Sequence, residues 1–137
     1  MLENNLKHHQ IMSRLHEPEI GKTRRIAGYV LTIIPSLMII GSGLAKVSGA
    51  EQMIENMGNI GLGEMTLFIG VLEILCVILY WIPKTSNIGF FLLCSYAGGI
   101  IVGELIGGNL PIPGISISVL FYVGTTLRKP YLSGLGI

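Results

Sequence analysis

The sequence predicts an all-α integral membrane protein, an antiparallel four-helix bundle with a short amphipathic interfacial helix between the first two spans. Half of the 137 residues are hydrophobic, only 12% are charged, and 19 are glycine. An ordinary soluble domain carries about twice that share of charge. Four apolar runs, at about 26–45, 64–82, 87–107 and 111–127, each approach the length that crosses a bilayer. The basic residues form no patch interleaved with aromatic residues, so nucleic acid is not an expected partner.

Residues 1–25 are polar and are predicted to form a basic cytoplasmic tail. The apolar run that follows starts too late and is too long for a cleaved signal peptide, so it is interpreted as a membrane span. The tail contains three histidines, but no acidic or cysteine residues stand at a metal-ligand spacing from them, and no metal site is predicted. The basic residues of the tail are Lys7, Arg14, Lys22, Arg24 and Arg25.

The first span, 26–45, carries small and polar residues on one helical face that ends in a cation. At 100° per residue this face contains Gly28, Thr32, Pro35, Ser42 and Lys46, and it should face the bundle interior.

The stretch 48–59 alternates apolar and polar residues at helical spacing and predicts the amphipathic interfacial helix. Ser48, followed three residues later by Glu51, is a capping-box signature, and Gly58 is expected to end the helix.

In the second span, 64–82, a single carboxylate, Glu73, lies in the otherwise apolar stretch 70–82. Inserting a charged residue at the bilayer centre costs at least about 2.5 kcal/mol, so Glu73 is expected to face a partner inside the bundle. Thr66, Gly70, Cys76 and Tyr80 fall on the same stripe, which predicts an inward face. The short turn after Pro83 makes the second and third spans antiparallel neighbours.

The third span, 87–107, carries small residues at intervals of four. Gly99, Gly103 and Gly107 follow Ser95 at this spacing, and such a ridge lets another helix approach closely, so helix packing is predicted there. Glu104 borders the ridge. The fourth span, 111–127, begins with a proline-rich turn whose prolines need no helical donor.

The distribution of basic residues sets the predicted topology. With four spans, all of the nine lysines and arginines except Lys46 fall on one side of the membrane. The positive-inside rule then places both termini in the cytoplasm, including the short tail 131–137, and the protein in the plasma (inner) membrane.

This topology brings Lys46 and Glu104 toward the outer leaflet and Glu73 near the midplane. Lys46 can pair with Glu104, or reach down along its flexible stem to Glu73. The sequence thus predicts an intramembrane polar site of Lys46, Glu73 and Glu104, bordered by Tyr80 and Cys76. No catalytic residue is predicted.

Five segments taken together carry a resemblance to a known family. They are Gly43-Leu44-Ala45-Lys46, Gly70-Val71-Leu72-Glu73, Ile82-Pro83-Lys84-Thr85, Gly98-Gly99 with Gly103-Glu104, and Leu127-Arg128-Lys129-Pro130. In this order and spacing the chain resembles the DoxX-like family of small four-span membrane proteins, from about residue 26 to 132. Many relatives have histidine at the position of Glu104, so a role for an imidazole there does not transfer.

The resemblance implies a loose range of functions. Some relatives are subunits of membrane redox assemblies, including thiosulfate:quinone oxidoreductases and a thiol-handling complex, and a distant branch assists receptor assembly. Three hypotheses follow: an accessory or quinone-interacting subunit of a membrane redox system, a non-catalytic assembly protein, and a small proton or solute carrier that uses Glu73. The chain is not expected to be catalytic on its own. No motif binds a cofactor; a quinone is the candidate ligand, and a redox protein or a second copy of the chain is the candidate partner.

Overall fold

The computed structural model describes residues 1–16 and 21–133, and the side chains of residues 1–9 and 21–132. All regular elements within these ranges are helical, which confirms the predicted all-α class. In chain order they are α1 (Leu2–His16), α2 (Lys22–Val47), α3 (Glu51–Asn59), the 3-10 turn η1 (Gly63–Met65), α4 (Thr66–Trp81), α5 (Ser86–Ile106), α6 (Ile112–Arg128) and α7 (Pro130–Ser133).

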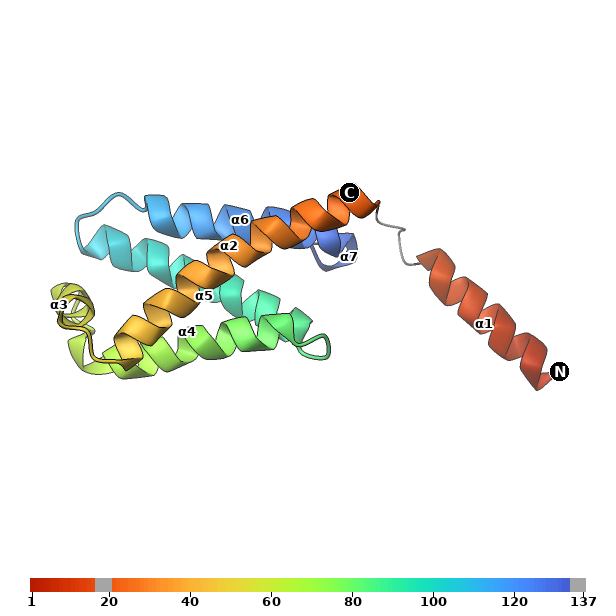
Figure 1. Cartoon of the computed structure of the whole chain (residues 1–137), viewed down its shortest axis with the longest axis horizontal. Helices are drawn as coiled ribbons and strands as arrows, with labels where there is room; N and C mark the ends of the chain where they lie inside the picture. The colour runs from red at the N-terminus through yellow and green to blue at the C-terminus, as the bar shows by residue number, and fades with distance from the viewer. Residues whose placement is uncertain (17–20, 134–137) are drawn as a thin grey trace.

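The helices α2, α4, α5 and α6 form the bundle (Figure 1). α2 packs against α4 and α6, and α5 packs against the same two helices, so α2 and α5 are diagonally opposed. One end of the bundle, here called the basic end, contains the start of α2 and the end of α6. The other, the α3 end, contains the end of α2 and the end of α5 (Figure 1). The eight described side chains of α1, those of residues 2–9, are all exposed to solvent.

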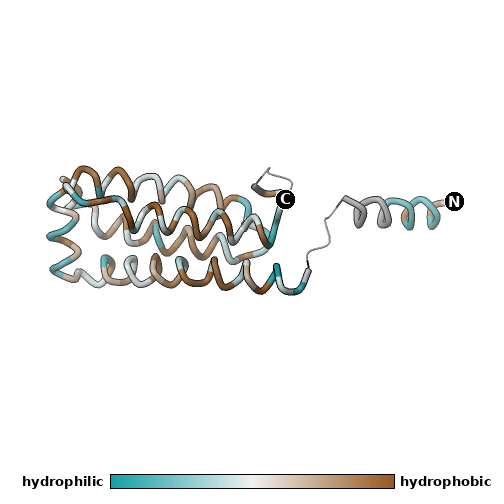
Figure 2. The backbone as a smooth tube through the Cα atoms, turned by 90° about the horizontal axis from the view of Figure 1, so that it is seen from above, coloured by the Kyte–Doolittle hydropathy of each residue, from teal (hydrophilic) through white to brown (hydrophobic). Residues whose placement is uncertain are grey.

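Among the described residues, three helical segments are long and apolar enough to cross a membrane: Lys22–Val47, Gly63–Trp81 and Ser86–Ile106. α6 is apolar but shorter, at 17 residues. Hydrophobic residues run along the four bundle helices, whereas hydrophilic residues gather at the two ends (Figure 2). Large apolar side chains are exposed on every bundle helix, for example Leu37, Phe68, Phe91 and Val119.

The inward faces agree with the helical stripes expected from the sequence. On α2, Gly28, Thr32, Pro35 and Lys46 are buried, and Ser42 is half-buried. On α4 the entire predicted stripe is buried, namely Thr66, Gly70, Glu73, Cys76 and Tyr80. The periodicity therefore fixed the rotation of both helices correctly.

Close helix contacts occur at glycines other than those predicted. A Cβ on Gly43 would lie 3.0 Å from the carbonyl oxygen of Gly70, and the two residues join α2 to α4. Gly89 of α5 lies directly against the backbone of Tyr80 on α4. On α5, by contrast, no atom lies within 4 Å of the position of a Cβ on Gly99. Within the described residues, Gly99 therefore packs against no helix; α4 and α5 approach closely only near their connecting turn.

α3 forms where predicted, but its ends differ from the prediction. Its N-cap is Ala50, which makes no side-chain cap, and the Ser48 hydroxyl donates to the carbonyl of Ala45 instead. The predicted capping box is therefore wrong. The helix also continues through Gly58, and the chain turns at Gly61, whose φ of +81° favours glycine.

Candidate functional site

The site begins with the buried carboxylate of Glu73 on α4. Its side chain is only 3% exposed, and Lys46 of α2 forms an ion pair with it, with Nζ 2.7 Å from Oε1. Lys46 Nζ also donates to Ser42 Oγ, one turn earlier on α2, at 2.7 Å. The Ser42 hydroxyl lies 3.4 Å from Oε1 and completes a three-residue network. The close approach of α2 and α4 at Gly43 and Gly70 brings these side chains together.

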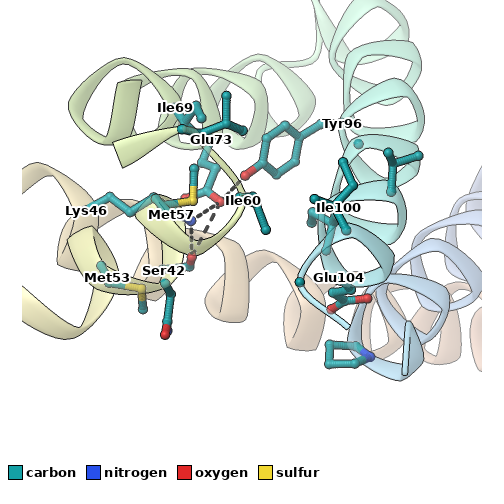
Figure 3. Close-up of a pocket in the computed structure, with 18 of the residues that line it drawn as sticks. Ser42, Lys46, Met53, Met57, Ile60, Ile69, Glu73, Tyr96, Ile100 and Glu104 are labelled. Atoms are coloured by element: carbon teal, nitrogen blue, oxygen red, sulfur yellow. Dashed lines mark hydrogen bonds and ion pairs between the residues drawn. The ribbon is translucent and has the colours of Figure 1, made fainter. Parts of the chain in front are cut away.

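Tyr96 of α5 is the fourth member of the network, and the sequence analysis missed it. Its hydroxyl donates to Oε1 of Glu73, so α2, α4 and α5 all meet at one carboxylate oxygen (Figure 3). A tyrosine inside an apolar helix was the available signal, since a buried tyrosine hydroxyl usually has a hydrogen-bond partner.

The network forms part of the wall of a cavity of about 910 Å³ at the α3 end. This volume is in the usual range for small-molecule pockets. Helices α2, α3, α4, α5 and α6 all contribute to its lining, which is mainly apolar. The apolar side chains include Met38, Met53, Met57, Ile60, Ile69, Ile100 and Ile117.

Glu104 lines the same cavity but does not join the network (Figure 3). Its Oε2 accepts a hydrogen bond of 3.2 Å from the backbone N–H of Gly114 at the start of α6. Of the two partners expected for Lys46, the structure therefore selects Glu73. The reason is geometric, because Lys46 and Glu73 lie on directly packed helices whereas α2 and α5 are diagonal.

Tyr80 and Cys76 were expected to border the polar site, and the structure places both elsewhere. Cys76 is 1% exposed in the apolar core and is not part of the cavity lining. Tyr80 lies two turns from Glu73 toward the basic end, where its hydroxyl is 2.8 Å from Thr125 Oγ1. Both side chains share the inward stripe of α4, but the cavity reaches only the α3 half of that stripe.

Tyr80 belongs to a second buried cluster, centred on Arg128. The Arg128 guanidinium donates to the Tyr80 hydroxyl at 3.2 Å. It also lies over the rings of Tyr29 and Trp81, at 4.5 and 5.0 Å from their centroids. Trp81 in turn donates to Ser36 Oγ at 2.9 Å. This cluster joins α2, α4 and α6 through cation–π and hydrogen-bond contacts, an arrangement that periodicity alone did not reveal.

The glycine ridge of α5 forms part of the cavity wall. Gly99, Gly103 and Gly107 all line the cavity. The side chain of Ile60, just after α3, lies over Gly103 and Gly107, with Cδ1 3.3 Å from the Cβ position of Gly103. The absence of side chains on this ridge therefore creates space, part of which Ile60 fills.

An all-helical bundle with apolar side chains outside and a buried ion pair inside is the pattern of a membrane protein. The family model of the DoxX-like family matches residues 30–126, and the chain belongs to this family. The matched range includes Ser42, Lys46, Glu73, Tyr96 and Glu104. Searches of curated proteins and of solved structures found no match.

Proposed function

We propose that this protein is a quinone-interacting accessory subunit of a membrane redox system. The observation that carries the proposal is the cavity at the α3 end, with an apolar lining and the Lys46–Glu73–Tyr96 network in its wall. A quinone has the matching shape, a flat polar ring on an apolar chain. The side chains of the network can bind and orient such a ring, and a partner protein would carry out the electron transfer.

The proposal includes a membrane topology. In it α2, α4, α5 and α6 all span the plasma (inner) membrane, and both termini are cytoplasmic. Its support is the concentration of basic residues at the basic end, to which Arg24, Lys84, Arg128 and Lys129 contribute. At 1.5 Å per residue α6 extends about 26 Å, close to the thickness of the hydrocarbon core. A reporter fused after Pro130 should be active only in the cytoplasm, and activity outside would reverse this topology.

Direct titration with quinone analogues tests whether the protein binds a quinone. The full chain in lipid nanodiscs should bind ubiquinone or menaquinone analogues saturably, with empty nanodiscs as the background. Gly99→Leu should weaken this binding at least tenfold, because the new side chain projects into the cavity. Gly41→Leu is the matched control, since Gly41 is exposed on α2 with nothing within 4 Å of its Cβ position and does not line the cavity. Absence of saturable binding, or equal losses in both variants, would refute the proposal.

A second candidate is a non-catalytic assembly role, and the outer surface of α5 favours it. Ser95 and Gly99 are both exposed there, Gly99 at the border of the cavity, and no helix in the described part of the chain lies within 4 Å of its Cβ position. A helix of another membrane protein could approach this surface closely. Under this candidate a partner co-purifies with the wild type and with Glu73→Gln but is lost in Gly99→Leu. Retention of the partner in Gly99→Leu would remove the candidate.

A further inference from the structure

The two oxygens of the Glu73 carboxylate are partnered very unequally. Oε1 receives the contacts from Lys46, Ser42 and Tyr96. Oε2 is fully buried and accepts no hydrogen bond from the part of the chain that the structure describes. Buried polar atoms in native proteins almost always have a partner, and leaving one without a partner is costly. The unpartnered oxygen therefore indicates a hydrogen-bond donor that the described residues do not supply.

The chemistry of the neighbouring groups narrows the class of donor. Lys46 has three N–H groups, and two of them are used by Ser42 and Glu73. A hydroxyl can satisfy both groups at once, because it donates to Oε2 of Glu73 and accepts from the third N–H of Lys46. A carbonyl can only accept and would leave Oε2 without a partner. An ammonium group would donate, but it would be repelled by the charge of Lys46.

A ligand in the cavity can reach this oxygen. Glu73 is one of the residues that line the cavity, although Oε2 itself is screened from water. The terminal torsion of a glutamate side chain has a broad energy profile, so a modest rotation can turn Oε2 toward the cavity.

From these contacts we infer that the cavity selects the hydroxyl-bearing, reduced form of its ligand, a hydroquinone over the corresponding quinone. Oε2 of Glu73 is the atom that makes the selection. The inference rests on the proposed function, because it concerns the same cavity and the same class of ligand. It adds the direction of preference and the residue that determines it.

The test compares a decyl-substituted benzoquinone with its hydroquinone, titrated anaerobically into the full chain in nanodiscs. Partitioning into empty nanodiscs is subtracted for each form. The wild type should bind the hydroquinone about tenfold more tightly, the value of one hydrogen bond to a charged group. In Glu73→Gln the amide N–H₂ can donate to a quinone carbonyl, so the preference should disappear or reverse. Glu55→Gln, the same change at an exposed residue of α3 that does not line the cavity, should keep the tenfold preference.

The outcomes separate this inference from the proposed function. Equal binding of both forms by the wild type, or an unchanged preference in Glu73→Gln, overturns the inference and leaves the proposed function standing. Failure of both forms to bind saturably overturns the proposed function as well. If Glu73→Gln does not fold, the wild-type ratio still decides whether the cavity prefers the hydroquinone, and equal binding of both forms overturns the inference.

Discussion

Removal of the Lys46 ammonium is the sharpest test of the buried network. In Lys46→Ala the Glu73 carboxylate keeps Tyr96 and Ser42 as neighbours but loses the cation 2.7 Å from Oε1. Because its side chain is only 3% exposed, water cannot readily replace that cation. Removing one partner of a buried ion pair typically costs about 3 to 5 kcal/mol. The unfolding equilibrium constant should therefore rise by at least about a hundredfold.

The assay can use the single tryptophan of the chain, Trp81, as a reporter. Trp81 packs between Tyr29 and Tyr80, and hydrogen-bonds to Ser36, so its fluorescence should report separation of α2 from α4. The purified protein is unfolded by titration with sodium dodecyl sulfate in mixed micelles, and the free energies of the variants are compared. Lys84→Ala is the control, because Lys84 is an exposed lysine in the turn between α4 and α5.

A double variant distinguishes the stability lost through an uncompensated charge from the stability lost through poorer packing. Lys46→Met with Glu73→Gln leaves no uncompensated charge and keeps most of the side-chain volume, so most of the lost stability should return. A loss below about 1 kcal/mol in Lys46→Ala would refute the reasoning. A double variant as unstable as the single one would also contradict it, because the loss would then come from packing.

Four smaller predictions use the same unfolding measurement. Gly89→Ala should cost at least about 1 kcal/mol, because the new methyl group collides with the facing backbone. Gly98→Ala has no described atom of a neighbouring element within 4 Å and should stabilise the helix by up to about 1 kcal/mol, so equal losses in both variants would contradict the packing. Tyr80→Phe should cost about 1 to 3 kcal/mol through its two lost hydrogen bonds, and a neutral result would count against the basic-end cluster. Ser48→Ala should change the free energy of unfolding by less than about 0.5 kcal/mol, because this hydroxyl does not cap α3. A larger loss would support the capping box after all. Burial and the neighbouring Arg128 lower the pKa of Lys129, so the unfolded chain keeps this proton to a higher pH than the folded chain. The free energy of unfolding should therefore rise with pH through that alkaline range. An equal rise in Lys129→Met would show that Lys129 is not its source.

The helices and their inward faces were predictable because they follow from local patterns. Hydropathy and the 3.6-residue period determine where a helix runs and which stripe faces inward, and the stripes containing Lys46 and Glu73 are both buried in the structure. The ends of α3 were less predictable. A capping signature such as that of Ser48 and Glu51 competes with other local hydrogen bonds, and here the Ser48 hydroxyl bonds to Ala45.

The contacts between helices were the harder part of the prediction. Small residues on α5 suggested packing at Gly99, yet the close approach of α5 to α4 occurs at Gly89, ten residues earlier. Spacing identifies a ridge that another helix can approach, but it cannot say whether a helix, a ligand or a single side chain such as Ile60 lies over it. For the same reason the prediction placed Tyr80 and Cys76 at the polar site, since both share the inward stripe of α4 with Glu73.

The sequence by itself determined that the chain forms apolar helices, where most of them run, and that a lysine and a buried carboxylate face inward. These properties depend only on residues a few positions apart. The tertiary structure decided that Lys46 pairs with Glu73 and not with Glu104, that Tyr96 completes the network, and that a cavity lies beside it. These features depend on which helices are neighbours and how closely they approach, and such distances join segments that are remote along the chain.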